Sequence, residues 1–345
     1  MKIIAVITFT LLLLGPVWAQ ESNPEIEIAA VGDILLGRGV RKMIENQGLE
    51  YPFEETAEVL SNADLTFGNL ENPLTDRCRK SLKKFRFRGD SQYAEILGQA
   101  GFDFISLANN HSLDCGRIGI EKTIESLARH QILSVGAGYD PGPGVGTAVA
   151  ATRAGKIGFA AFTSISPVAP GEPFEGVLKS DAETVTQTIS ELKTRVDVVI
   201  VSFHWGTEYA LGVNQDQVRP AKLAVEAGAD VVLGHHPHVL QRIEVIDRGP
   251  WKRKALVAYS LGNFVFDSPV RLNRHLAESL ILKLRVNAEG LLGAKIVPVS
   301  IEGYRAVLAK GEVRARILER IVRTSGKFGT EIVEDRIVLE RGRNE

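Results

Sequence analysis

The sequence has 345 residues, with 41 basic and 42 acidic side chains and a formal net charge of −1. Charges of both signs are interspersed along the chain, which argues against a general nucleic-acid-binding protein. The length is sufficient for one large α/β domain or two smaller ones. The sequence contains no internal repeat and no low-complexity linker that would divide it.

The N-terminus has the pattern of a secretory signal peptide. Lys2 precedes an apolar run from Ile3 to Leu14, and Ala19 is a small residue before the expected cleavage point. The run is shorter than a membrane-spanning helix requires, and no Cys stands at the junction for a lipid anchor. We therefore expect residues 1–19 to be removed and the mature protein to be extracytoplasmic, in the periplasm or secreted. An uncleaved N-terminal membrane anchor is the alternative.

Apolar periodicity predicts strands and helices that alternate along most of the chain. Strands are predicted at 25–31, 64–67, 102–107, 132–135, 147–152, 157–162, 197–203, from 231 onward, 239–246 and 255–260, with further β alternation over 277–304. Helices are predicted at 38–47, 54–61, 92–100, 116–129, 182–193, 217–227 and 311–322. The segment 136–146 is a Gly- and Pro-rich loop, and 167–173 has the irregular composition of a lid. Apolar strands separated by helices imply two mixed, largely buried sheets with helices on their faces.

Three histidines, His235, His236 and His238, fall within four positions directly after the apolar strand that begins at Val231. Close packing favours neutral imidazoles, which is the form that ligates metals. Open α/β sheets place their ligands at the carboxyl ends of strands. The cluster therefore predicts a site that handles a metal or a phosphate, with a purely structural cluster as the alternative.

Residues of metal-ligand type also follow four other predicted strands. They are Asp33, Asn69 or Glu71, Asn110 with His111, and His204. Together with His236 and His238 they form a nitrogen and oxygen ligand set that suits Zn, Mn or Fe. Two such ions can share a bridging carboxylate and stabilise both attacking and leaving oxygens. His111 is then placed as a general acid for the leaving group. Each residue alone is more typical of a turn or a packed ring, so the prediction depends on their joint occurrence.

Several other residues are candidates for supporting roles. Glu208 is predicted to orient His204 or to bind substrate, with a surface carboxylate as the alternative, and Asn263 to stabilise a turn beside the site. The segment 76–88 carries seven basic residues. Within it, Arg86 and Arg88 are candidates to bind an anionic polymer through paired hydrogen bonds to carboxylates, and a solvated loop is the alternative.

The two cysteines, Cys78 and Cys115, each follow a stretch assigned to the site. They are compatible with one disulfide in an oxidising compartment. Such a bond would join two loops of the site, and two free thiols are the alternative.

The order of these motifs resembles that of the CapA family of poly-γ-glutamate capsule synthesis proteins, which is related to calcineurin-like metallophosphoesterases. The similar motifs are Gly32-Asp33, Gly68-Asn-Leu-Glu71, Leu107-Ala-Asn-Asn-His-Ser112 with Asp114 and Gly116, His204-Trp-Gly with Glu208-Tyr209, Gly234-His-His-Pro-His238 and Ser260-Leu-Gly-Asn-Phe264. They span residues 26 to 267, most of the mature chain. The resemblance implies a four-layer α/β/β/α sandwich of two mixed sheets, metallophosphoesterase-like, with its site at the carboxyl ends of the strands.

Residue by residue, the resemblance implies metal-ligand roles for Asp33, Asn110, His204 and the pair His236 and His238. It implies the catalytic role for His111, and His235 is the alternative to His236. Two positions depart from the metallophosphoesterase pattern. Leu35 stands where that pattern has a histidine, and Asn69 stands where it has an aspartate. Either Asn69 or Glu71 must then act as the bridge, and a one-metal site or a site for a different bond is a second interpretation.

We expect a catalytic domain at 26–270, with the β hairpins and helix of 271–345 completing the same domain. The resemblance implies a metal-dependent hydrolase or transferase that acts on an anionic envelope polymer such as poly-γ-glutamate, with one or two divalent ions and a membrane synthase complex as a possible partner. A non-catalytic polymer-binding component of export or assembly is one alternative. A small-molecule phosphoesterase is the other. No nucleic-acid partner is expected.

Overall fold

The computed structural model describes residues 23–78, 85–139, 146–168, 175–249, 253–268 and 273–339. The predicted signal peptide at 1–19 lies outside these residues. So do 79–84 in the basic segment, 140–145 in the Gly- and Pro-rich loop, and 169–173 in the predicted lid. In the part of the chain that is described, no helix combines the length and hydrophobicity needed to cross a membrane.

The larger of the two sheets formed by the described residues has ten strands, in the order β15-β16-β13-β12-β1-β2-β3-β4, with β11 beside β1 and β14 beside β13. These strands are β1 (Ile26–Ile34), β2 (Leu65–Leu70), β3 (Phe104–Ser106), β4 (Leu133–Val135), β11 (Asn263–Val265), β12 (Glu278–Asn287), β13 (Gly290–Glu302), β14 (Arg305–Leu308), β15 (Ile332–Val333) and β16 (Arg336–Ile337). β1 to β4 are parallel neighbours, whereas β12 pairs antiparallel with β1. The C-terminal part of the chain therefore extends the sheet beside its first strand.

The smaller sheet has six strands among the described residues, in the order β5-β6-β7-β8-β10-β9. They are β5 (Thr147–Thr152), β6 (Gly155–Thr163), β7 (Val198–His204), β8 (Val231–His235), β9 (Ile243–Ile246) and β10 (Ala255–Ala258). β6, β7, β8 and β10 are parallel, and β5 and β9 form antiparallel edges. Both sheets are thus mixed, as predicted.

The alternation of side chains along the smaller sheet separates two cores. In β7, Val198 and Ile200 belong to the core shared with the larger sheet, whereas Val199, Val201 and Phe203 belong to the core under helices α5 and α6. Successive residues of a strand point to opposite faces, so a continuous apolar run is the pattern of a strand that is buried on both sides.

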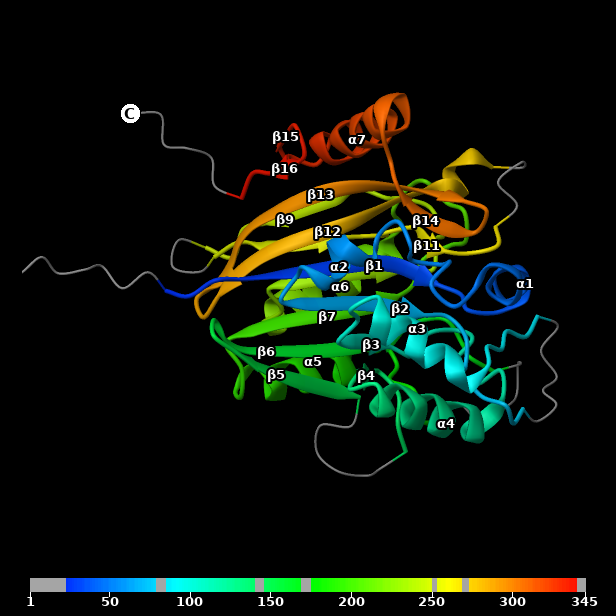
Figure 1. The fold of residues 1–345 in the computed structure, drawn as a ribbon. Coiled ribbons are helices and arrows are strands. Elements are labelled where there is room, and N and C mark those ends of the chain that lie inside the picture. Colours follow the sequence, from blue (N-terminus) through cyan, green and yellow to red (C-terminus); the bar gives the residue numbers. More distant parts are fainter. Residues whose placement is uncertain are drawn as a thin grey trace, which may run out of the picture.

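Helices cover the outer faces of the two packed sheets (Figure 1). α5 (Ala182–Lys193) and α6 (Gln215–Ala227) pack on the smaller sheet. α2 (Ala57–Ser61) contacts β2, α4 (Gly116–Arg129) contacts β4 and α7 (Gly311–Gly326) contacts β13. α1 (Arg38–Gln47) follows β1, and α3 (Ala94–Gln99) contacts α4. The described chain therefore forms the predicted four-layer α/β/β/α sandwich.

Some predicted boundaries were wrong. The strand predicted at 239–246 begins at Ile243, because the preceding residues pair with the segment that follows β10 through one bridge between Leu240 and Leu261. The helix predicted at 54–61 begins at Ala57, after a turn in which Phe53 accepts the hydrogen bond of the Thr56 amide. The short strands β11, β14, β15 and β16 were not predicted.

Candidate metal centre

The first two strands of the larger sheet supply the acidic part of the site. Asp33 in β1 is in register with Asn69 in β2, and Glu71 follows β2 directly. The chain before β11 approaches β1 so closely that a Cβ at Gly32 would lie 2.0 Å from the carbonyl oxygen of Gly262. Glycine is therefore required at position 32, and the Asp33 backbone donates a hydrogen bond to the same oxygen at 2.9 Å.

The smaller sheet supplies the histidines. β7 ends at His204 and β8 ends at His235, with His236 and His238 in the turn that follows. Both turn residues have positive φ angles, 92° and 58°, a region that residues other than glycine rarely adopt. The backbone N–H of His236 donates to Asp33 Oδ2 at 3.1 Å, which ties this turn to the larger sheet.

Glu71 lies at the centre of the site and is fully buried. Among the described residues, neither of its carboxylate oxygens accepts a hydrogen bond. Its Oε1 lies 3.7 Å from His204 Nε2 and 3.8 Å from His238 Nε2. Burial raises the pKa of this carboxyl well above its usual value; His238 opposes the rise and Asp33 adds to it. A buried carboxylate without hydrogen-bond partners lowers the stability of the fold unless a cation or a proton compensates its charge.

Within the described residues, two groups of potential ligand atoms share Glu71. One group contains Asp33, Glu71 and His238, and the other contains Glu71, His204 and His236. In each group the atoms lie within 4.8 Å of one another. His236 Nδ1 is buried and has no hydrogen-bond partner in the described chain. This donor set fits one divalent ion, or two ions with Glu71 between them.

The charges of the site favour a cation. Burial opposes ionisation of Asp33, but His235 and His238 outweigh burial and hold the pKa of this carboxyl well below its usual value. Burial lowers the pKa of His204 well below its usual value and that of His236 to about 3. Burial acts on His238 too, yet Glu71 and Asp33 raise its pKa to about 9. Because a metal binds neutral imidazole, a metal would take the place of the proton on His238.

Asn69 and Glu71 were left as alternatives for the bridging position, and the structure separates them. The Asn69 amide nitrogen donates to Asp33 Oδ1 at 2.8 Å, and its oxygen accepts from Asn109 Nδ2 at 3.2 Å. Both ends of the amide are therefore engaged in orienting Asp33 and the loop that carries His111. Glu71 is the residue with carboxylate oxygens available to an ion.

His235 is a member of neither group that shares Glu71, although it contacts Asp33. It is buried, its Nδ1 is 3.2 Å from Asp33 Oδ1, and its ring lies 6.4 Å from that of Phe67. Asn263 instead supports His238, because its Oδ1 lies 2.8 Å from His238 Nδ1. Glu208, which is exposed, forms a further group with His236 and His238 at the edge of the site.

His111 is held by two contacts to its ring and one to its backbone. Its Nδ1 lies 2.6 Å from Asp114 Oδ2, and its backbone N–H donates to Asn109 Oδ1 at 3.1 Å. The ring stacks on Phe87 with 3.7 Å between centroids. The predicted ligand Asn110 places its Oδ1 2.9 Å from His204 Nε2. No role was predicted for Asp114 or Phe87; the spacing of three residues between His111 and Asp114 was the available signal.

The position where the metallophosphoesterase pattern has a histidine is apolar in space as well as in sequence. Leu35 is fully buried and forms a small cluster with Phe87 and Phe266. Phe87 stacks on His111 and Phe266 lies 4.9 Å from the ring of His238. Leu35, Phe87 and Phe266 thus form an apolar wall between His111 and His238. The metallophosphoesterase pattern would supply another ligand at this place.

The remaining candidates lie around the site. Arg86 is exposed, and Arg88 lies 3.7 Å from Asp90. Cys78 and Cys115 form a disulfide, which joins the segment leading to Phe87 with the loop that carries His111. Trp205 is buried against Phe203, and its Nε1 donates to a backbone carbonyl at 2.9 Å.

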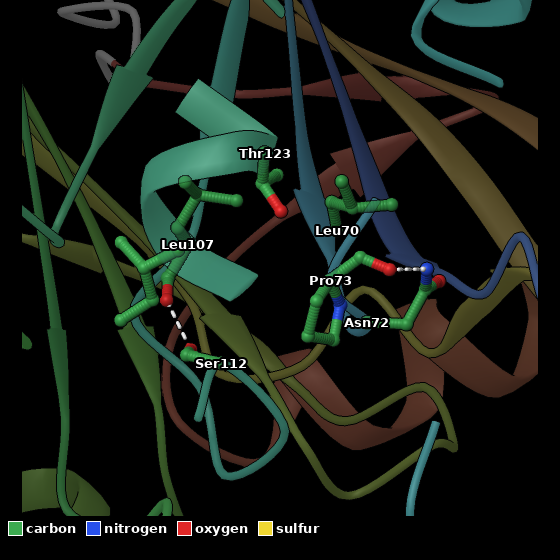
Figure 2. Close-up of a pocket in the computed structure, with 7 residues that line it drawn as sticks. Leu70, Asn72, Pro73, Leu107, Ser112 and Thr123 are labelled. Carbon is green, nitrogen blue, oxygen red and sulfur yellow. Dashed lines mark hydrogen bonds between the residues drawn. The ribbon is translucent and has the colours of Figure 1, made fainter. Parts of the chain in front are cut away.

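A small cavity lies beneath the loops that follow β2 and β3 (Figure 2). It is lined by Leu70, Asn72, Pro73, Leu107, Ser112, Ile120 and Thr123. Asn72 accepts the Leu36 amide at 2.7 Å, Ser112 donates to the Leu107 carbonyl, and Thr123 accepts the Leu74 amide at 2.8 Å. These bonds brace the loops next to Glu71 and His111, so the cavity belongs to the floor of the site.

The fold has a solved counterpart. The crystal structure described as a novel phosphatase from Mycoplasma pneumoniae superposes with a TM-score of 0.53, over 86% of this chain and 98% of that chain, at 16% sequence identity. This similarity confirms the predicted metallophosphoesterase-like fold.

The family is shown by sequence. The profile of the bacterial capsule synthesis protein PGA_cap matches residues 27–268, and the chain belongs to this family. The PGA biosynthesis protein CapA of Bacillus subtilis is 29% identical over 326 residues, which covers 92% of this chain and 83% of that protein. The capsule biosynthesis protein CapA of Bacillus anthracis is 29% identical over 339 residues, covering 92% and 80%. The resemblance to the CapA family is therefore confirmed.

Proposed function

We propose that this chain is an extracytoplasmic, metal-dependent enzyme of capsule synthesis that acts on poly-γ-glutamate or a similar anionic polymer, as a hydrolase or transferase. The observation that carries metal dependence is the buried Glu71, which has no hydrogen-bond partner among the described residues and is shared by two groups of ligand atoms. The polymer is proposed from the family and from the name of the Bacillus subtilis relative. A membrane synthase complex is the proposed partner.

The residues proposed to hold the metal are Asp33, Glu71, His204, His236 and His238. When bound, Zn, Mn or Fe would supply Lewis acidity and a nucleophilic hydroxide. The fold positions these side chains by strand register and by the bonds from Asn69 and His236 to Asp33. Ligands fixed in this way need little rearrangement to accept the ion.

His111 is proposed to give a proton to the leaving group. Asp114 accepts the Nδ1 proton of the ring, which leaves Nε2 as the nitrogen that exchanges a proton with substrate. Stacking on Phe87 fixes the plane of the ring. A positioned pair of this kind favours a catalytic role over polymer binding alone, because binding alone does not require an oriented proton donor.

The small-molecule phosphoesterase is less well supported by the site. Leu35 replaces a histidine of the metallophosphoesterase pattern and packs with Phe87 and Phe266. The site therefore has fewer ligands and a more apolar wall than that chemistry uses. An apolar wall next to charged groups suits a polymer whose carboxylates are separated by methylene groups.

The extracytoplasmic location is proposed from the N-terminal signal pattern of residues 1–19. The Cys78–Cys115 disulfide is of the kind that persists in oxidising compartments. Fractionation of expressing cells, with N-terminal sequencing of the processed protein, should find the chain outside the cytoplasm beginning near Gln20. Recovery of unprocessed protein in the cytoplasm would contradict this proposal.

The test of the function compares two substrates on purified mature protein. Metal content is measured by mass spectrometry, and the protein is then incubated with poly-γ-glutamate and with a generic phosphodiester. We expect at least one bound divalent ion and a change in the length of the polymer. Metal-free protein after growth in metal-replete medium would refute the proposal, and turnover of the phosphodiester alone would support the phosphoesterase.

A further inference from the structure

Arg38 is the first residue of α1, directly after the loop that follows β1, and lies at the margin of the candidate metal centre. Its φ angle is 51°, in the left-handed region. Of the seven non-glycine residues with positive φ in the described chain, three others, Tyr209, His236 and His238, belong to the same neighbourhood. Strained backbone of this kind persists where the surrounding structure enforces it and is concentrated at functional sites.

The guanidinium of Arg38 is directed to the wall of the site. Its central carbon lies 5.0 Å from the centroid of the Phe87 ring, and Phe87 stacks on His111. Tyr209, whose ring lies 5.9 Å from that of His238, is on the same rim. Burial raises the pKa of the Tyr209 hydroxyl, Glu208 and Glu71 raise it further, and Arg38 lowers it. Arg38 and Glu71 thus act electrostatically on the same hydroxyl.

Arg38 uses little of its hydrogen-bonding capacity on the other described residues. Its Nε lies 3.2 Å from Asp267 Oδ2, and its side chain is 47% exposed. Among the described residues, Asp267 is its one ion-pair partner. Asp267 Oδ2 also accepts the Gly39 amide at 2.9 Å, which fixes the carboxylate that holds Nε. A guanidinium has five donors in a planar fork, so the edge away from Asp267 can bind an anion through two parallel hydrogen bonds.

Arg86 and Arg88, which the sequence suggested as binders of an anionic polymer, are placed differently from Arg38. Arg88 lies 3.7 Å from Asp90, and Arg86 is exposed beside the buried Phe87. Arg41, one turn further along α1, is paired with both Glu45 and Asp90, at 2.9 and 3.0 Å. Arg38 alone among these four combines an accessible guanidinium with contact to the ring that supports His111.

We infer that Arg38 binds a carboxylate of the substrate and thereby selects an anionic unit at the mouth of the site. The inference rests on the proposed polymer function and deepens it. A γ-linked glutamate unit carries a free α-carboxylate beside methylene groups. Arg38 offers a cation for that carboxylate beside the apolar cluster of Leu35, Phe87 and Phe266.

The test measures binding, on metal-depleted protein, of a γ-glutamyl oligomer and of the same oligomer with methyl-esterified carboxylates. The variants are Arg38→Met, which keeps the apolar stem, Arg38→Lys, and the matched control Arg41→Met on the same helix. We expect Arg38→Met to weaken binding of the anionic oligomer about tenfold or more. Arg38→Lys should fall between because it lacks the fork. Arg41→Met should bind like the native chain, and the esterified oligomer should bind all variants alike.

The outcomes separate the inference from the proposed function. Arg38→Met that binds the anionic oligomer as tightly as the native chain overturns the inference while leaving the polymer function intact. Equal weakening for the anionic and esterified oligomers also overturns it, because it indicates a structural role for Arg38. If the native chain binds neither oligomer, the proposal of a γ-glutamyl substrate is refuted, and the inference that Arg38 binds its carboxylate is refuted with it.

Discussion

The two sheets contribute different chemistry to one site. The larger sheet supplies the carboxylates Asp33 and Glu71 and the proposed proton donor His111, whereas the smaller sheet supplies imidazoles, through His204 and the turn after β8. Each of the two groups that share Glu71 combines residues of both sheets. Packing of the sheets against each other therefore brings the members of both groups together.

The two sheets also differ in how burial affects the charges of their site residues. Burial keeps His204 and His236 neutral by lowering their pKa values, and it opposes ionisation of Glu71. His204 and His236 on the smaller sheet are therefore ready for a cation, whereas ionised Glu71 on the larger sheet needs a cation to offset its charge. Changes on the two sides should accordingly have different consequences.

The largest effect is expected from Glu71→Gln, which removes the carboxylate common to both groups. Bound metal and turnover should both be lost, with at least a hundredfold weaker metal affinity, because the two halves no longer share a charged ligand. Metal content and polymer cleavage are the measurements. The metal-free variant should be at least as stable as the native chain, since it no longer buries a carboxylate that lacks a hydrogen-bond partner among the described residues.

The matched control is Glu208→Gln, an exposed carboxylate at the edge of the same site. It should retain its metal and most of its turnover. If Glu208→Gln loses the metal and Glu71→Gln keeps it, the centre lies at the edge with His236 and His238, and the assignment of Glu71 is wrong.

The next effect separates the proton donor from the ligands on the larger sheet. His111→Ala should lower turnover by about 10²- to 10⁴-fold while the metal stays bound. Asp114→Asn should cause a smaller loss, because the ring remains but its Nδ1–H loses a charged acceptor. Turnover and metal content are measured on the same samples. Loss of metal in His111→Ala would instead make His111 a ligand.

A third prediction concerns the Cys78–Cys115 disulfide, which closes a separation of 37 residues on the side of the larger sheet. Replacing both cysteines by serine should lower the free energy of unfolding by about 3–4 kcal/mol, because the unfolded chain regains the freedom of the open loop. Urea unfolding is the measurement. An unchanged midpoint for the double variant would show that the covalent link does not stabilise these loops.

The smallest effect is expected in the pH dependence of the free energy of unfolding, through His236 on the smaller sheet. The pKa of His236 is lowered from 6.5 to about 3 by burial. A lowered pKa means that the unfolded state binds the proton first, so the stability contributed by His236 is present above pH 6.5 and is lost as the pH falls toward 3. In metal-free protein, His236→Gln should reduce the slope of unfolding free energy in this window by up to ~1.4 kcal/mol per pH unit.

The control for this measurement is His130→Gln, since His130 is an exposed residue at the end of α4. Its slope should match that of the native chain in urea titrations at pH 7 and pH 5. Equal slopes for His236→Gln and the native chain would show that His236 titrates as an exposed histidine does.

Much of the fold and of the site was open to prediction because buried parallel strands are apolar along their length. A polar residue that interrupts such a run therefore marks the carboxyl end of a strand, as Asp33 and His204 do. Helices such as α4 and α5 could be placed to the residue because their apolar spacing is regular. β11 was missed because three residues following a tight turn carry no periodicity.

The choice between Asn69 and Glu71 required the tertiary structure. Residues two apart in an extended chain point to the same side, so the pattern allows either to reach the site. Asn69 forms hydrogen bonds with Asp33 and Asn109, which come from elsewhere in the chain, and we therefore propose Glu71 for this position. Likewise, the sequence suggested Arg86 and Arg88, which flank Phe87 along the chain, as the arginines that bind an anion. The tertiary structure instead places the Arg38 guanidinium over the Phe87 ring, which stacks on His111.

By itself, then, the sequence determined which strands end in residues of metal-ligand type, since burial forces the rest of each strand to be apolar. The tertiary structure decided which of those ligands meet, because only the packing of the two sheets brings Glu71 beside His204 and His238. Local pattern records the environment of a residue along its own strand, and distance between strands is not contained in it.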